Sequence, residues 1–219
     1  SIAIPKLLSA RLAANESAAI ATLRSLSSAQ AQIQSSAAID TDADGGGEYG
    51  FFAELAGQFP MRISNAGVPA AGIVGTDELS PAVLSSAFGT VDAQGVVTRS
   101  GYCYAIYLPT NGVAPTGLGE NAGGGAAAPF PDSDNSEILW CAYAWPQTFG
   151  SSGNRAFFIN QEGDLLQMNN RDAAVNQYTT ALLAPGFDAA YDGAQANDMA
   201  ARIASGMVGA DGNTWVPVQ

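Results

Sequence analysis

Residues 1–36 constrain the fold of this chain more than any other stretch. They contain no glycine, and their only proline is Pro5, so nothing beyond the first turn interrupts a helix. At about 100° per residue, one face of that helix collects apolar side chains that would face a core. They are Leu8, Leu12, Ala19, Leu23, Leu26 and Ile33. Asn15 and Gln30 interrupt this stripe, and large apolar side chains become sparse after Ser25, so we expect the second half of the helix to hold the core less firmly.

The charge of the chain excludes several classes of partner. Twenty acidic residues against 8 basic ones give a net charge of −12, whereas nucleic-acid binding needs clustered Lys and Arg. We therefore expect no nucleic-acid partner and no attraction to anionic lipid. The chain has no histidine, which removes Ser-His-Asp and Cys-His catalysis and favours oxygen-ligated metals such as calcium. Paired carboxylates of the glycosidase kind occur by chance in so acidic a chain, and we expect no enzyme.

After the first helix, strand signals become frequent. We expect strands at 96–108, 137–145, 155–160, 165–168 and 214–218, and short helices at 49–57, 81–88 and around 197–205. The turn at 161–164 predicts a hairpin between two of these strands. The pattern predicts an α+β fold, in which a long N-terminal helix (1–36) packs on an antiparallel β-sheet head (37–219).

The two cysteines, Cys103 and Cys141, each lie in an aromatic, strand-like run. A disulfide between them is our preferred interpretation and would be typical of an exported protein. Closing so long a loop would stabilise the fold by about 3–4 kcal/mol in the chain-entropy model. The alternative is a pair of buried free thiols.

The start of the helix reads Ala3-Ile4-Pro5 and continues as LLSARLAANE over residues 7–16. This start resembles type IV pilins and type II secretion pseudopilins, in which an apolar stem ends in an Ala-Ile-Pro step before the helix enters a globular head. The runs at 140–146 and 157–163 also resemble the head of a bacterial pilin-like subfamily. Only residues 1–4 of such a stem are present, and the family's processing site and stem acid are absent from this chain.

The resemblance implies a structural subunit of an extracellular type IV pilus-like filament. Its partners would be copies of itself, joined through the N-terminal helix. A missing N-terminal stem would anchor it in the inner membrane before assembly at the cell surface. The close alternative is a pseudopilin of a type II secretion system. Two further hypotheses are a soluble calcium-dependent binding or adhesion module, and an ordinary domain whose first helix is simply a core helix.

An acidic loop follows the helix and matches the first half of a calcium loop, D-x-D-x-D-G. Alternate carboxylates in a tight turn converge on one point, and Gly45 permits the bend. The candidate ligands are Asp40, Asp42, Asp44, Gly46 through its carbonyl, and Glu48. Position 12 of the motif is Phe51, so the closing glutamate is missing, and a solvated turn without a metal is the alternative. A second, weaker cluster is interpreted as a polar loop; it consists of Asp132, Asp134, Asn135 and Glu137.

Overall fold

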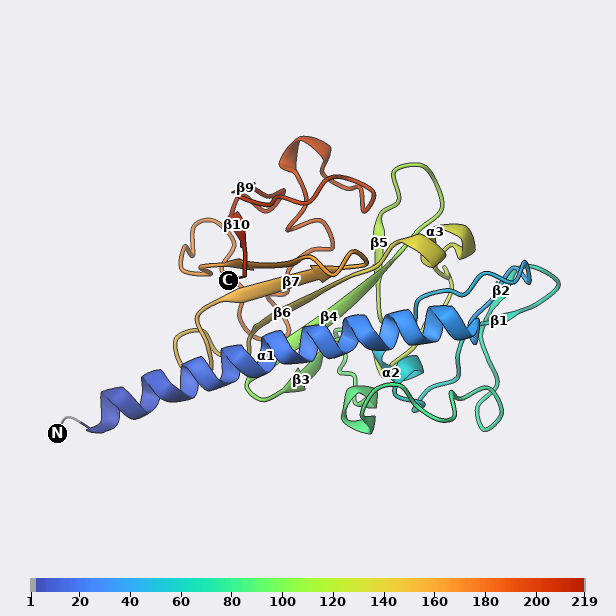
Figure 1. Cartoon of the computed structure of the whole chain (residues 1–219), viewed down its shortest axis with the longest axis horizontal. Helices are drawn as coiled ribbons and strands as arrows, with labels where there is room; N and C mark the ends of the chain where they lie inside the picture. Colours follow the sequence, from blue (N-terminus) through green and yellow to red (C-terminus); the bar gives the residue numbers. More distant parts are fainter. Residues whose placement is uncertain (1–2, 219) are drawn as a thin grey trace.

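A computed structural model describes the backbone of residues 3–218 and the side chains of residues 7–218. Helix α1 (Ala3–Ser36) lies along one face of an eight-stranded antiparallel sheet (Figure 1). The predicted α+β class, with a long N-terminal helix and a large antiparallel sheet, is therefore confirmed.

The large sheet runs in the order β3-β4-β6-β7-β8-β10-β9, and β5 pairs with β4 beside β3. Its strands are β3 (Val97–Arg99), β4 (Tyr102–Pro109), β5 (Gly117–Gly119), β6 (Cys141–Pro146), β7 (Ala156–Asn160), β8 (Leu165–Met168), β9 (Met207–Val208) and β10 (Thr214–Pro217). A two-stranded sheet pairs β1 (Ile63–Ser64) with β2 (Pro69–Ala70). The short helices are α2 (Phe52–Leu55), α3 (Ser133–Ile138) and the 3-10 turns Ser86–Gly89 and Gly193–Gln195.

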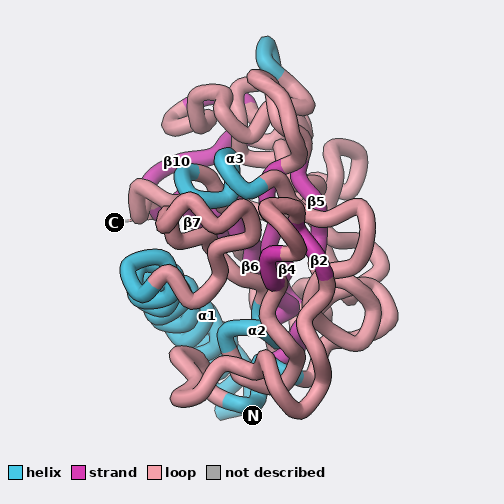
Figure 2. The backbone as a smooth tube through the Cα atoms, turned by 90° about the vertical axis from the view of Figure 1, so that its right-hand side faces the viewer, coloured by secondary structure: helices cyan, strands magenta, loops and turns pink. Residues whose placement is uncertain are grey.

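The central strands are buried on both faces, which explains why they are apolar almost throughout. Strand β6 turns Ala142 and Ala144 toward the α1 side and Tyr143 and Trp145 toward the other side. Small side chains on the α1 side let the helix approach the sheet closely. The opposite face is covered by the mostly irregular residues 169–213, and Figure 2 shows how much of the molecule around the strands is loop.

Helix α1 is buried along its second half. Its buried apolar side chains are Ala19, Leu23, Leu26, Ala29 and Ile33, which pack against β4, β6 and β7. Leu7 and Leu8, by contrast, are 73% and 44% exposed, where the helix extends past the head (Figure 1). The prediction that the second half holds the core less firmly is wrong. It counted only the large Leu26 and Ile33, whereas Ala29 and the buried Gln30 amide also fill this part of the interface.

That buried amide belongs to Gln30, which is fully inaccessible to solvent. Its Nε2 donates to the Gly50 carbonyl at 2.8 Å, and its Oε1 accepts from the Gly50 N–H at 3.0 Å. Both polar ends of the side chain are therefore satisfied inside the core. Gln30 interrupts the apolar stripe without weakening it, because it pairs with backbone that leads into α2.

Three further polar side chains of α1 bind the head. The Asn15 amide donates to the Ser152 carbonyl at 2.8 Å, and Gln34 donates to the Glu137 carbonyl. Glu16 forms an ion pair with Arg155 at 2.7 Å and accepts from the Asn154 N–H at 3.0 Å. These contacts are spaced along the helix from Asn15 to Gln34, so they fix its register on the sheet.

Several predicted elements are confirmed, some with shifted boundaries. The hairpin over 155–168 is β7–β8, the 49–57 helix contains α2, and the last strand is β10. The predicted strand at 96–108 is instead a hairpin, β3–β4. Its turn residues Ser100 and Gly101 both have positive φ, which suits a tight hairpin. The strand expected from 137 starts only at Cys141, because α3 occupies residues 133–138.

Two predicted helices are wrong. At 81–88 the N–H groups of Val83 and Leu84 both donate to the Leu55 carbonyl, so they make no helical bonds, and only the 3-10 turn follows. Around 197–205 the Asp198 carboxylate accepts from the Ala200 N–H at 2.8 Å. Such local side-chain bonds compete with helix formation and replace it here.

The predicted disulfide is also wrong. Both cysteines are free and fully buried. In the β4–β6 ladder Cys103 pairs with Trp145, whereas Cys141 pairs with Tyr107. The two thiols therefore sit four rungs apart, which is about 13 Å along a strand and too far for an S–S bond. Burial raises the pKa of both thiols, so they are poor nucleophiles.

The two hydrogen bonds between the Gln30 amide and Gly50 can be tested for their contribution to the attachment of α1. Gln30→Ala leaves the Gly50 N–H and carbonyl buried without partners, and we expect the free energy of unfolding to fall by about 2–4 kcal/mol. Gln32→Ala, on the exposed side of the same helix, is the control and should change stability by less than about 0.5 kcal/mol. Urea denaturation measures both variants. Equal stability of the two variants would contradict the role given to the amide.

Candidate functional site

The acidic loop brings three carboxylates together at the end of the molecule beyond Ser36. One oxygen from each of Asp40, Asp42 and Asp44 lies within 4.8 Å of the others. The loop is shaped by its own carboxylates, since Asp40 accepts from the Gly45 N–H at 3.1 Å and Asp44 accepts from the Gly46 N–H at 2.7 Å. Gly45 has a φ of +96°, a backbone conformation that a side chain disfavours.

A fourth carboxylate, that of Glu137 in α3, lies beside the loop but outside the group of three aspartate oxygens. Glu137 lies so close to Gly46 that a Cβ there would stand 2.0 Å from Glu137 Oε1. Burial raises the pKa of Glu137, and the charges of Asp44 and Asp42 raise it further. Within the described part of the chain, neither Glu137 Oε1 nor Asp40 Oδ1, both buried atoms, has a hydrogen-bond partner. These two oxygens are the ligand atoms that a bound cation would satisfy.

The structure places Glu48, another predicted ligand, elsewhere. Its Oε2 pairs with Arg62 Nη1 at 3.0 Å, and its Oε1 accepts from the Thr41 N–H at 2.7 Å. Burial raises the pKa of Glu48, and the Arg62 charge opposes that rise. Both oxygens are therefore in use, and we leave Glu48 out of the candidate ligand set. Gly46 stays within the loop, beside Glu137.

The Arg62 guanidinium is the centre of a buried polar network beneath the loop. It also contacts Glu54 at 3.2 Å and donates to the Tyr49 carbonyl. Arg62, Glu48 and Glu54 are each at most 2% exposed. Removing one partner would leave a buried charge unpaired, which is strongly destabilising. The network joins residues 41–62 into one unit, which makes it structural.

Glu120 is a second buried carboxylate, and it holds the start of α2. Its oxygens accept from the N–H groups of Phe52 at 3.1 Å, Ala53 at 2.8 Å and Gly125 at 2.8 Å. Burial nevertheless raises its pKa to about 8, with these three bonds opposing the rise. Glu120 thus links the 117–125 segment to α2.

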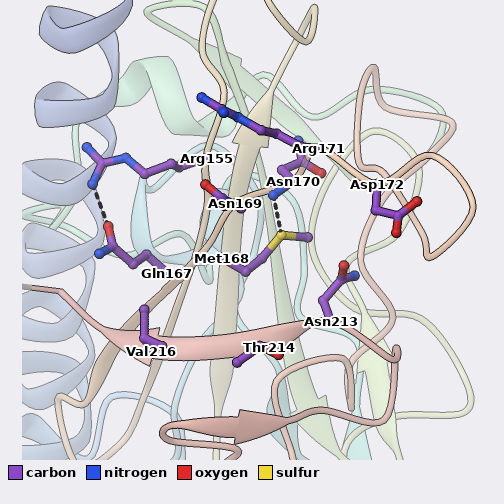
Figure 3. A pocket seen from close by; sticks show the side chains of 10 residues that line it. All are labelled: Arg155, Gln167, Met168, Asn169, Asn170, Arg171, Asp172, Asn213, Thr214 and Val216. Carbon is purple, nitrogen blue, oxygen red and sulfur yellow. Dashed lines mark hydrogen bonds between the residues drawn. The ribbon is translucent and has the colours of Figure 1, made fainter.

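A pocket of about 470 Å³ lies on the head near the point where Arg155 pairs with Glu16 of α1 (Figure 3). Its lining residues are Arg155, Gln167, Met168, Asn169, Asn170, Arg171, Asp172, Asn213, Thr214 and Val216. Arg155 is committed to Glu16 and Gln167, and Asn170 binds the backbone of Tyr178 through both ends of its amide. The lining offers one hydroxyl, from Thr214, and one carboxylate, from Asp172.

Sequence reasoning finds the three aspartates but misses the residues that reach them from elsewhere in the chain. It assigns Glu137 to a separate polar loop because this residue lies far along the chain from Asp44. It misses the buried role of Gln30 because a polar residue on an apolar face looks like an interruption, and it assigns no role to Glu16. Their positions on the core-facing side are the signal, since a buried polar side chain requires a partner.

Comparisons with protein-family models, with curated proteins and with solved structures found no match to this chain. In residues 3–218, no helix combines the length and the hydropathy needed to cross a bilayer. The function is therefore argued from the geometry and from the sequence.

The buried carboxyl of Glu120 should make the free energy of unfolding depend on pH. Its native pKa of about 8 exceeds its ordinary value of 4.5, so the folded protein retains a proton that the unfolded chain loses. Raising the pH from 5 to 8 therefore lowers the free energy of unfolding through this group, by an amount on the order of 1 to a few kcal/mol. We expect Glu120→Gln to show a smaller loss over this interval.

Denaturant titrations at a series of pH values compare the wild type with Glu120→Gln. Glu162→Gln, at an exposed position in the β7–β8 turn, is the control and should keep the slope of the wild type. Parallel stability curves for the wild type and Glu120→Gln would show that this carboxyl is ionised in the native protein at neutral pH.

Proposed function

We propose that this chain is a structural subunit of an extracellular type IV pilus-like filament. The observation that carries the proposal is the asymmetry of α1. Its second half is buried on the sheet, whereas its first part extends past the head and exposes Leu7 and Leu8 (Figure 1). At about 1.5 Å per residue, a helix of 34 residues is about 50 Å long, and its first turns extend past the head (Figure 1).

An exposed, partly apolar extension of a helix needs a partner that shields it from water. In a filament, that partner is supplied by neighbouring subunits. The resemblance of residues 3–16 to type IV pilins supports the same assembly. We accordingly propose an inner-membrane location before assembly and a cell-surface location afterwards, with no enzymatic role. Because both cysteines are free, no disulfide supports export, and the location rests on the helix alone.

The alternative is a pseudopilin of a type II secretion system, which shares the helix-and-head arrangement but serves a secretion apparatus rather than a surface filament. A soluble calcium-dependent binding module is the second alternative. It is favoured by the acidic loop alone and leaves the extended part of α1 unexplained.

Immunogold electron microscopy of the native host tests the filament. An antibody against the head should decorate long surface filaments, and loss of the gene should abolish them. A Leu7→Asp/Leu8→Asp product should fold normally but no longer enter filaments, because two charges replace the exposed apolar contacts. Leu182→Asp, which alters an equally exposed leucine on the head, is the matched control. Label restricted to the cell envelope, with loss of protein secretion in the mutant, would favour the pseudopilin instead.

We also propose that the acidic loop binds calcium through Asp40, Asp42, Asp44 and Glu137. The three aspartate oxygens within 4.8 Å of one another repel, Glu137 beside the loop adds to the negative charge, and an oxygen-seeking cation offsets the repulsion. Two buried ligand oxygens without other partners support the proposal.

Calcium at about ten times its dissociation constant should raise the free energy of unfolding by about 1–2 kcal/mol. The melting temperature should then rise by about 2–8 °C. Asp42→Asn and Glu137→Gln should each reduce this shift, whereas Asp164→Asn, in the β7–β8 turn, should keep it. Scanning calorimetry with added calcium and with chelator measures the shift. Identical melting curves in calcium and in chelator would show that the acidic loop does not bind calcium.

A further inference from the structure

The exposed start of α1 is basic as well as apolar. Residues 1–15 contain Lys6 and Arg11 and no acidic residue, in a chain whose net charge is −12. Arg11 is exposed, one turn from the exposed Leu7 and Leu8. We name Leu7, Leu8 and Arg11 the proximal turn.

The opposite end of the molecule carries the complementary surface. Val68, Ile73 and Val74 are 61%, 62% and 78% exposed, on the loops next to β2. The acidic loop lies beside the turn that carries Val68, since a Cβ at Gly67 would be 3.4 Å from the Asp42 carbonyl. Ile73 and Val74 lie in the next loop, in which the Asp77 carboxylate accepts from the Ile73 N–H at 2.7 Å and the Glu78 carboxylate accepts from the Gly75 N–H at 2.6 Å. We name this surface the distal patch; it consists of Val68, Ile73, Val74, Asp42, Asp44, Asp77 and Glu78.

The chain around the distal patch supplies no free basic side chain. Between Arg24 and Arg99 the sequence contains one basic residue, Arg62, and its guanidinium is buried with Glu48 and Glu54. The patch therefore presents apolar side chains within an uncompensated negative field. A partner that is both apolar and positively charged would bind it best.

One molecule cannot join its own two surfaces. The proximal turn and the distal patch lie at opposite ends of the long axis (Figure 1). From Leu8 to Ser36 alone, the helix spans 28 residues, or about 42 Å. A contact between different patches at opposite ends of a molecule is heterologous, and such contacts build rings or extended assemblies.

We propose that the proximal turn of one copy docks on the distal patch of a second copy, with Leu7 and Leu8 against Val68, Ile73 and Val74, and Arg11 facing the carboxylates. The proposal rests on the filament function, because it names the head surface that receives the exposed helix of a neighbouring subunit.

Disulfide trapping tests the contact with two variants of the full chain, each of which carries one added cysteine. When Leu8→Cys and Val74→Cys are mixed and mildly oxidised, they should form a cross-linked heterodimer. Both positions are exposed, so neither variant should fold differently, and the native Cys103 and Cys141 are buried and unreactive. The control pairs Leu8→Cys with Leu182→Cys, since Leu182 is 77% exposed, as Val74 is at 78%, but lies outside the distal patch.

We expect the 8/74 pair to cross-link at least about five times faster than the 8/182 pair. Adding Arg11→Glu to the Leu8→Cys chain, or raising the salt to about 1 M, should remove most of that difference, because the attraction is electrostatic. Equal rates for the two pairs, or no effect of Arg11→Glu, would overturn the proposal. Filaments seen by immunogold with no 8/74 trapping would refute this contact and leave the filament function standing, so the two failures are distinguishable.

Discussion

The fold depends on how one long helix is attached to the head. Apolar contacts alone would hold α1 in more than one register, because alanines and leucines one turn apart are similar in size. The polar contacts remove that freedom, since Gln30 can satisfy both ends of its amide only at Gly50, and Glu16 pairs with Arg155. Each of these contacts is long-range in sequence, so the helix and the head must fold together.

On the other face of the sheet, too, apolar packing fills the core and specific polar contacts hold the covering segment in place. This face is covered by residues 169–213, which have almost no regular structure. Aromatic side chains of the sheet form hydrogen bonds with the backbone of these residues. Tyr143 donates to the Phe187 carbonyl at 2.9 Å and accepts from the Ala190 N–H at 3.0 Å, and Trp145 donates to the Thr180 carbonyl. The rings fill the core while their polar groups satisfy the loop that covers them.

Periodicity predicts the helix, the β7–β8 hairpin and the last strand, because those signals are local. It fails where distant partners decide the structure. Val83 and Leu84 donate to Leu55 rather than to a helical neighbour, and the Cys103–Cys141 pair is refuted by a strand register that spacing alone does not reveal. The acidic loop illustrates both cases. Its three aspartates follow a local motif, whereas Glu137 enters through the packing of α3.

The proposed calcium site and the proposed contact between copies share the distal end of the head, so calcium would affect both. Asp42 of the acidic loop lies beside Gly67 in the turn before β2, so a cation that fixes the loop would also restrict Val68, the next residue. The same cation would reduce the negative charge that attracts Arg11, but it would leave Asp77 and Glu78 untouched. Calcium would therefore order the apolar part of the distal patch while weakening its long-range attraction. Contact between copies would then depend less on salt in calcium than in chelator, because more of its free energy would come from buried apolar surface.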